Sequence, residues 1–172
     1  MEMVKEWLPS AEPPVQEIMA VDGSMSMFKV YERTFNIGRE TKRFRLVNFT
    51  SGRIALDWME QNPERTPSAI LLDRHLEGFS GIDTLKRLKA DDRWKAIPVI
   101  MVSFQGEESH VVEAIKSGAS DFMVKPLQSG VLTSKLLRVL AAREAAVKRN
   151  PGSAVLHRLP SAVQKALAEG AP

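Results

Sequence analysis

Four short apolar runs in the sequence each end in a residue that could do chemistry. The runs at 18–21, 69–72, 99–102 and 122–124 are followed by Asp22, Asp73, Ser103 and Lys125. Unbroken apolar runs of this length are typical of parallel strands that are buried on both faces. Because the carboxyl ends of parallel strands meet at one edge of a sheet, we expect these four side chains to converge.

Two carboxylates, a hydroxyl and an ammonium group suit phosphoryl transfer. A carboxylate such as Asp73 can accept a phosphoryl group as a nucleophile. A divalent cation held by acidic oxygens, together with Lys125 and Ser103, can neutralise the phosphoryl oxygens. Taken singly, each residue has a plainer interpretation as a loop carboxylate, a hydroxyl satisfied by backbone or a solvated lysine. Their common position after successive strands favours a shared site.

Amphipathic segments separate the apolar runs. Strands are predicted over 18–21, 44–49, 69–72, 98–102 and 121–124, and helices over 24–36, 51–61, 80–90, 107–117 and 128–148. Strands that alternate with helices favour an α/β fold, a doubly wound five-stranded parallel sheet with right-handed crossovers.

Helical spacing of apolar residues predicts which helix faces are buried. The first helix presents Met25, Phe28, Tyr31 and Phe35, the second Ile54, Ala55 and Trp58, and the last Leu132, Leu136, Val139 and Leu140. The last helix extends toward Val147, where less of the sheet remains to be covered. We therefore predict that it takes part in partner docking or in a homodimer.

The composition excludes several classes of protein. The 172 residues are 44% hydrophobic and 26% charged, contain no cysteine and carry a net charge of +3. Disulfides and thiolate metal sites are therefore excluded, and no apolar run approaches the roughly 18 residues of a membrane span. The start of the chain lacks the pattern of a secretory signal, so we predict a cytoplasmic protein without membrane insertion. Basic clusters at 39–45 and 138–149 are interpreted as solvated surface, with no direct nucleic-acid contact.

Prolines and glycines suggest the domain boundaries. Pro9, Pro13 and Pro14 predict a flexible leader over residues 1–15, because proline disfavours a helix there. Residues 16–149 form the predicted domain. After the break at Asn150-Pro151-Gly152, residues 150–172 are predicted to be a linker or a short helical tail.

Five motifs in order resemble the receiver domain of two-component response regulators. They are Val21-Asp22-Gly23-Ser24, then Leu71-Leu72-Asp73 with Gly78-Phe79-Ser80-Gly81, the segment 97–103, the segment 118–122 and Val124-Lys125-Pro126. The resemblance covers about residues 16–148. It implies the flavodoxin-like (βα)5 receiver fold with strand order 2-1-3-4-5, and a signalling protein rather than an enzyme that acts on other substrates.

The resemblance also implies a role for each matched residue. Asp73 matches the phosphoacceptor, Ser103 the switch hydroxyl, Lys125 the lysine that pairs with the phosphoryl group, and Phe122 the switch aromatic. Asp22, Asp73 and the backbone carbonyl of His75 match the ligands of Mg2+. The implied partners are a histidine kinase or phosphotransfer protein and a downstream protein that reads the surface formed by the fourth helix, the fifth strand and the fifth helix.

Two positions depart from the family pattern. Gly23 replaces a second acidic residue that normally ligates magnesium, so we predict that the metal is weakly bound. Phe104 follows the switch hydroxyl, where a small residue is usual, and its ring could cover the pocket or enter the core. Two hypotheses therefore remain, a phosphorylation switch and a pseudo-receiver that binds partners without phosphorylation. A flavin binder is disfavoured, because no phosphate-cradling loop follows the first strand.

Overall fold

The computed structural model describes residues 15–37 and 44–149 of the chain. The predicted tail, and the predicted leader apart from Val15, lie outside these residues. The strands are β1 (Gln16–Val21), β2 (Phe44–Phe49), β3 (Ala69–Asp73), β4 (Val99–Ser103) and β5 (Asp121–Val124). The helices are α1 (Met25–Ile37), α2 (Gly52–Gln61), α3 (Gly81–Ala90), α4 (Glu108–Lys116) and α5 (Ser129–Arg149).

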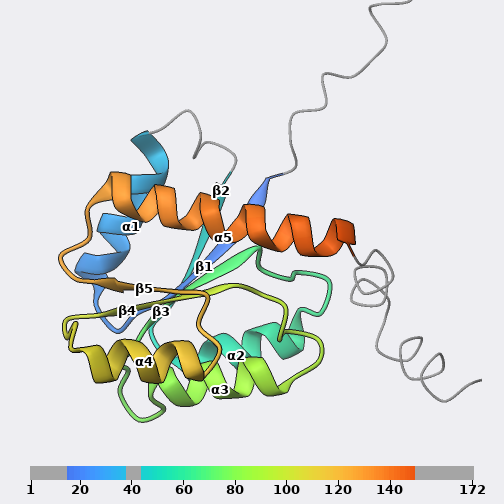
Figure 1. Cartoon of the computed structure of the whole chain (residues 1–172), viewed down its shortest axis with the longest axis horizontal. Coiled ribbons are helices and arrows are strands. Elements are labelled where there is room, and N and C mark those ends of the chain that lie inside the picture. The colour runs from blue at the N-terminus through green and yellow to red at the C-terminus, as the bar shows by residue number, and fades with distance from the viewer. Residues whose placement is uncertain (1–14, 38–43, 150–172) are drawn as a thin grey trace, which may run out of the picture.

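The described strands form one parallel sheet with helices on both faces. The strand order is β2-β1-β3-β4-β5, as predicted. Helices α1 and α5 cover one face, and α2, α3 and α4 cover the other (Figure 1). The chain reverses its winding direction around β1 and β3, so the carboxyl ends of these two strands lie at the switch point of the sheet, where ligands of such folds generally bind.

Local sequence signals explain where the helices begin and end. The Ser51 side chain accepts a hydrogen bond from the amide of Arg53, and that of Ser80 accepts one from the amide of Asp83. Gly118 follows α4 with a φ of +98°, a conformation that favours glycine. Observed and predicted boundaries agree within about two residues, because caps and glycines mark them in the sequence.

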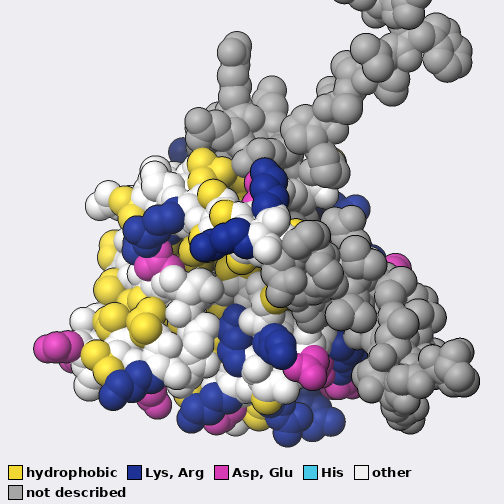
Figure 2. Space-filling view, turned by 45° about the vertical axis from the view of Figure 1, so that its right-hand side comes forward, with side chains coloured by type: hydrophobic (Ala, Val, Ile, Leu, Met, Phe, Trp, Pro, Cys, Tyr) yellow, Lys and Arg dark blue, Asp and Glu magenta, His cyan; other side chains and the backbone are white. Residues whose placement is uncertain are grey.

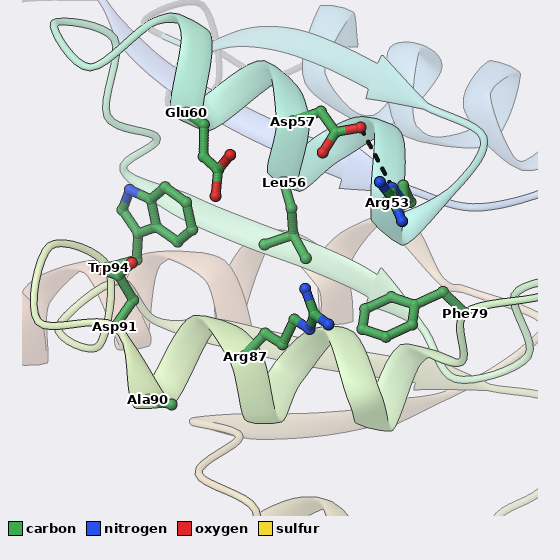
Figure 3. A pocket seen from close by; sticks show the side chains of 9 residues that line it. All are labelled: Arg53, Leu56, Asp57, Glu60, Phe79, Arg87, Ala90, Asp91 and Trp94. Atoms are coloured by element: carbon green, nitrogen blue, oxygen red, sulfur yellow. Dashed lines mark ion pairs between the residues drawn. The ribbon is translucent and has the colours of Figure 1, made fainter.

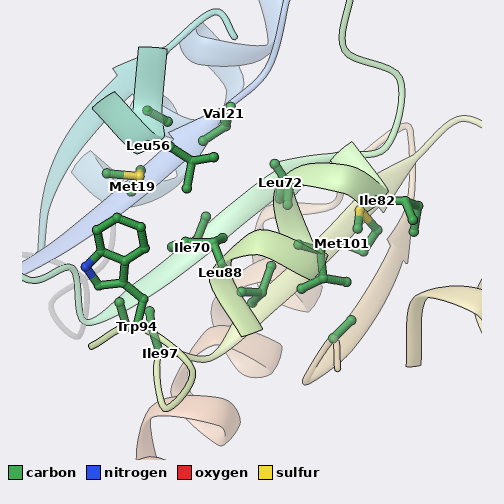
Figure 4. Packing of buried hydrophobic residues seen from close by; sticks show 14 of the residues in the cluster. Met19, Val21, Leu56, Ile70, Leu72, Ile82, Leu88, Trp94, Ile97 and Met101 are labelled. Atoms are coloured by element: carbon green, nitrogen blue, oxygen red, sulfur yellow. The ribbon is translucent and has the colours of Figure 1, made fainter. Parts of the chain in front are cut away.

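Two apolar layers hold the sheet between the helices. One layer packs β1, β3 and β4 against α2 and α3 through residues such as Met19, Leu72, Leu88 and Met101 (Figure 4). The other packs the opposite face of the sheet against α1 and α5. The predicted α5 stripe of Leu132, Leu136, Val139 and Leu140 is buried in this second layer and is confirmed.

Two residues of the predicted helix faces are exposed, although Phe28, Tyr31 and Phe35 are buried as predicted. Met25 is 67% exposed, whereas Met27 is buried, and Ile54 is 52% exposed, whereas Leu56 and Met59 are buried. Both helices offer more apolar residues than one face can hold. Which residues at the edge of each apolar face are buried is therefore decided by the fit against the sheet.

Candidate phosphoacceptor site

The predicted residues Asp22, Asp73 and Lys125 meet at the carboxyl edge of the sheet. Lys125 Nζ lies 2.9 Å from Asp22 Oδ2 and 2.8 Å from Asp73 Oδ2. The Lys125 side chain is 1% exposed and that of Asp22 is 0% exposed. Burying an ammonium group is costly, and its two carboxylate partners offset that cost here. One ammonium between two carboxylates leaves the cluster with one net negative charge.

Backbone amides and a close backbone approach position the two carboxylates. Asp22 Oδ1 accepts a hydrogen bond from the amide of Ser24, and Asp73 Oδ1 accepts one from the amide of His75, at 2.9 and 3.0 Å. Gly81 lies so close to the end of β3 that a Cβ there would approach the Asp73 carbonyl oxygen to 2.0 Å. The glycine lets α3 begin directly beside the phosphoacceptor candidate.

Tyr31 is a site neighbour that the sequence reasoning missed. Its hydroxyl donates a hydrogen bond of 3.2 Å to Asp22 Oδ2, and its side chain is fully buried. Burial raises the pKa of Tyr31 strongly, and the negative charge of Asp22 raises it further. Helical spacing placed Tyr31 on the apolar face of α1. A tyrosine hydroxyl on a buried helix face needs a hydrogen-bond partner, and this need was the signal in the sequence.

Ser103 ends β4 beside the charged cluster. Its hydroxyl is buried and accepts a hydrogen bond of 3.1 Å from the amide of Gln105, and its carbonyl accepts one of 2.8 Å from the amide of Lys125. The hydroxyl hydrogen is therefore free of the Gln105 contact and is available to a ligand in the pocket. The peptide bond between Lys125 and Pro126 is cis.

Phe104 points toward the site rather than into the core. Its side chain is 69% exposed, and the Lys125 ammonium lies 4.7 Å from the centre of its ring. Of the two orientations left open by the sequence, the structure therefore adopts the one near the pocket. Phe122, in contrast, is buried in the apolar layer with α2, α3 and α4.

The donor atoms around the cluster are of the kind that a magnesium ion prefers. They are the hard carboxylate oxygens of Asp22 and Asp73. Gly23 adds no side-chain oxygen, and no group of three or more His, Cys, Asp or Glu side chains that could hold a metal occurs among the described residues. His75 contributes only backbone atoms here, because its side chain is exposed and its amide contacts Asp73.

An ion pair links the loop after β3 to α4. Arg74, the residue after Asp73, places its guanidinium 2.8 Å from the Glu113 carboxylate. In α4 only Ala114 is fully buried, so the helix is attached to the sheet by few apolar contacts. The Arg74–Glu113 pair therefore supplies a specific connection between the site and this helix.

A separate groove of about 480 Å³ lies between α2 and α3. Leu56 and Phe79 line it together with charged residues of both signs, and Arg53 pairs with Asp57 along the α2 side (Figure 3). It includes none of the four residues that the sequence analysis assigned to chemistry.

Comparison with protein families matches residues 18–137 to the response regulator receiver domain. This match spans more than half of the chain. The chain belongs to the response regulator receiver domain family. Such receivers are signal-transduction modules that interact with histidine kinases and downstream effectors, and they generally bind Mg2+ at an acidic pocket.

Curated relatives of this receiver include chemotaxis and transcriptional regulators. It is 28% identical to the chemotaxis protein CheY1 of Helicobacter pylori over 129 residues, which are 74% of this chain and 99% of that protein. It is 40% identical to the phosphate regulon transcriptional regulatory protein PhoB of Pseudomonas aeruginosa over 77 residues, 45% of this chain and 34% of that protein.

Solved structures confirm the receiver fold. The chemotaxis protein CheY4 of Vibrio cholerae has a TM-score of 0.64 at 22% identity, covering 73% of this chain and 98% of that one. A response regulator receiver domain protein of Clostridium thermocellum has a TM-score of 0.66 at 17% identity, covering 76% and 98%.

The surface of this receiver is mixed in charge. Figure 2 shows basic and acidic side chains intermingled on one face, with small hydrophobic patches between them. None of the described helices has the length and apolar character needed to cross a membrane.

Proposed function

We propose that this receiver is a phosphorylation switch whose phosphoacceptor is Asp73. The observation that carries the proposal is the bridge from Lys125 Nζ to both Asp73 and Asp22, with the Ser103 hydroxyl on the neighbouring strand. A buried ammonium beside the nucleophilic carboxylate is suited to balance the charge of an incoming phosphoryl group.

Each residue has a distinct part in the proposed transfer. One carboxylate oxygen of Asp73 forms a bond to phosphorus as the donor bond breaks. Lys125 shifts from the carboxylate pair toward the new phosphoryl oxygens, and the Ser103 hydroxyl donates a hydrogen bond to one of them. Asp22 retains a hydrogen bond from Tyr31, which lowers the penalty of losing part of its contact with Lys125.

Asp22, Asp73 and the backbone carbonyl of His75 are the proposed ligands of Mg2+. When bound, the ion would neutralise phosphoryl charge. The proposed donor is a histidine kinase or a phosphotransfer protein. Because Gly23 provides no carboxylate, we expect weak metal binding and slow transfer.

The proposed output surface consists of α4, β5 and α5. Val112, Ile115 and Val124 are exposed apolar side chains on the first two of these elements. The Arg74–Glu113 ion pair connects this surface to the residue that follows the phosphoacceptor. A change at Asp73 can therefore alter how α4 is held. A homodimer through α5, on which Val147 is exposed, remains a prediction.

Intact-mass measurement with acetyl phosphate and Mg2+ tests the proposal. We expect one phosphoryl adduct on the wild type and none on Asp73→Asn, which preserves the shape of the side chain but removes the nucleophile. An adduct that persists in Asp73→Asn would assign the phosphoacceptor elsewhere. Failure of the wild type to label at saturating Mg2+ would refute phosphorylation.

A pseudo-receiver is the second candidate, and two observations favour it. Gly23 leaves the site with two carboxylates, and the Phe104 ring lies over Lys125. In this alternative the protein binds its partner through the same output surface without phosphorylation. Partner affinity that is equal for wild type and Asp73→Asn, with and without acetyl phosphate, would support this alternative over the switch.

A further inference from the structure

Lys89, in the last turn of α3, is held by backbone oxygens rather than by a carboxylate. Its ammonium donates hydrogen bonds to the carbonyls of Lys95 and Ile97, at 3.0 and 2.6 Å. The stem of the side chain packs on Gly118, where an added Cβ would approach Lys89 Cγ to 2.9 Å. The nitrogen of Lys89 therefore has a defined position at the amino edge of the sheet, opposite the edge that carries Asp73.

The neighbouring carboxylates do not stabilise the Lys89 ammonium. Lys89 forms no ion pair within the part of the chain that the structure describes. The two carboxylates that follow α3 have other partners: Asp91 pairs with Arg93, and Asp92 pairs with Lys95. The protonated form of Lys89 is therefore held only by uncharged carbonyl groups.

The one charged side chain that acts on Lys89 among the described residues is a cation. Arg143 comes from α5 on the other face of the sheet and bonds the carbonyls of Pro67 and Ser68, at 3.0 and 2.6 Å. Burial, and secondly the positive charge of Arg143, lowers the pKa of Lys89 from its ordinary 10.5 to about 8. About a quarter of the amine is then neutral at pH 7.5.

The two carbonyls leave one position on the Lys89 nitrogen open for reaction. A charged lysine nitrogen carries three hydrogens. Two of them bond the carbonyls of Lys95 and Ile97, so loss of the third costs neither hydrogen bond. Because the nitrogen is tetrahedral, the lone pair of the neutral amine points away from both carbonyls, and an electrophile can approach it there.

We propose that Lys89 is an acylation site that accepts the acyl group of a small acyl phosphate. The neutral amine attacks the carbonyl carbon, a carbon–nitrogen bond forms, and the bond from that carbon to the phosphate oxygen breaks. Inorganic phosphate leaves, and the proton lost from nitrogen passes to phosphate or to solvent. The proposed transfer to Asp73 differs, because there phosphorus is attacked and the carboxylic acid part of the donor leaves.

Acylation changes how Lys89 holds the segment between α3 and β4. An acylated nitrogen keeps one hydrogen, so it can bond only one of the carbonyls of Lys95 and Ile97. The modification also removes the positive charge that faces Arg143. It therefore weakens the connection of α3 to the segment that leads into β4.

The low basicity of Lys89 sets the size of the expected effect. A pKa near 8 in place of 10.5 raises the neutral fraction at pH 7.5 by about 200-fold. A less basic nucleophile attacks more slowly, which for thiols offsets about half of such a gain on a logarithmic scale. We therefore expect acetylation of Lys89 to be about 10-fold faster than that of an ordinary lysine.

The wild-type chain contains its own controls. Lys86 on α3 and Lys116 on α4 are exposed lysines. The folded protein is treated with acetyl phosphate over a series from about pH 6.5 to pH 9.5, and acetylation of each lysine is measured by mass spectrometry of peptides. Lys89 should be modified about 10-fold faster than Lys86 and Lys116 at pH 7.5, and its rate should level off above about pH 8.

Two variants test the assignment. Lys89→Arg keeps the charge and the hydrogen-bond donors but cannot be acetylated in this way, so the fast adduct should disappear. Arg143→Gln removes the neighbouring charge and should move the midpoint of the pH profile at Lys89 to higher pH.

Three results would overturn the proposal: acetylation of Lys89 no faster than that of Lys86 and Lys116, a rate at Lys89 that still rises steeply above pH 9, or a fast adduct that persists in Lys89→Arg. An unchanged midpoint in Arg143→Gln would overturn the part assigned to the charge of Arg143. Phosphoryl adducts on Asp73 have a different mass and are counted in the same spectra. Failure of acetylation is therefore distinguished from failure of the proposed phosphorylation.

Discussion

Substitution of Gly23 by aspartate should restore a third carboxylate to the site. The position tolerates a side chain, because a Cβ on Gly23 would meet only the Thr50 carbonyl oxygen, at 4.0 Å. Positive φ values among the described residues are confined to Gly78 and Gly118. Gly23 therefore has a backbone conformation that aspartate can adopt without strain.

The expected gain in metal affinity follows from charge. The present cluster carries two carboxylates and one ammonium, and the variant adds one unit of negative charge on the solvent side of Asp22. A contact to a charged group contributes about 2 kcal/mol, which corresponds to roughly 30-fold in the dissociation constant of Mg2+. Labelling of Asp73 by acetyl phosphate at low Mg2+ should accelerate by a similar factor.

The metal-free variant should be slightly less stable than the wild type. Replacing glycine restricts the unfolded chain and stabilises the fold by about 0.4–1 kcal/mol. Repulsion from Asp22 and Asp73 opposes this by about 1–3 kcal/mol at the effective dielectric of a protein surface. We expect a net loss of about 1 kcal/mol without metal, which saturating Mg2+ reverses because binding favours the folded state.

Paired titrations of wild type and Gly23→Asp with Mg2+, followed by labelling, test this reasoning. Gly23→Asn controls for the added side chain without the charge. Gly130→Asp, at an open position on α5, controls for charge far from the site. If the wild type already binds Mg2+ as tightly as Gly23→Asp and labels as fast, the missing carboxylate is not a defect and the electrostatic argument fails.

Three further substitutions probe the surroundings of the site. Gly81→Ala should destabilise the fold by about 1–3 kcal/mol, measured by urea unfolding, because its Cβ would overlap the Asp73 carbonyl; an unchanged midpoint would contradict the close packing. The wild type should lose stability above pH 10, because the unfolded state releases the Tyr31 proton there while the raised pKa of Tyr31 keeps it bound in the folded state. Tyr31→Phe should abolish this loss, and parallel pH profiles of the two proteins would refute the reasoning. For Asp121, burial raises the pKa, but hydrogen bonds from Lys135, the amide of Phe122 and Arg138 lower it below its ordinary value. Its stabilising contribution is therefore present above about pH 4 and is lost as the pH falls further, so Asp121→Asn should show a weaker loss of stability than the wild type from pH 4 to pH 2. Equal acid sensitivity of the two proteins would count against this pairing.

Much of the fold follows from local patterns in the sequence. The apolar runs that end at Asp22, Asp73, Ser103 and Lys125 are strands of the sheet. Strands that are buried on both faces have continuous apolar runs in place of alternating apolar and polar residues, so the sequence alone predicts them. Alternation of these runs with helices limits the topology, because parallel strands need crossovers of one hand. The convergence of the four polar groups follows in turn from the common carboxyl edge.

Contacts between distant segments required the tertiary structure. The exposure of Met25 and Ile54, and the burial of Met27 and Leu56, at the edges of the apolar faces was decided by packing against the sheet. Periodicity identified Tyr31 as a core residue but not as the partner of Asp22, since a hydroxyl's direction depends on the element packed against it. The Arg74–Glu113 pair had no local signal at all.

By itself, the sequence determined the secondary structure, the sheet and the set of residues at its edge. The tertiary structure decided how those residues are paired and where the Phe104 ring lies. Lys125 reaches Asp22 across 103 positions of the chain, and the direction of the Phe104 ring depends on the position of that ammonium. Backbone propensities act over a few residues, whereas pairing of buried charges is decided only when strands from distant parts of the chain lie side by side.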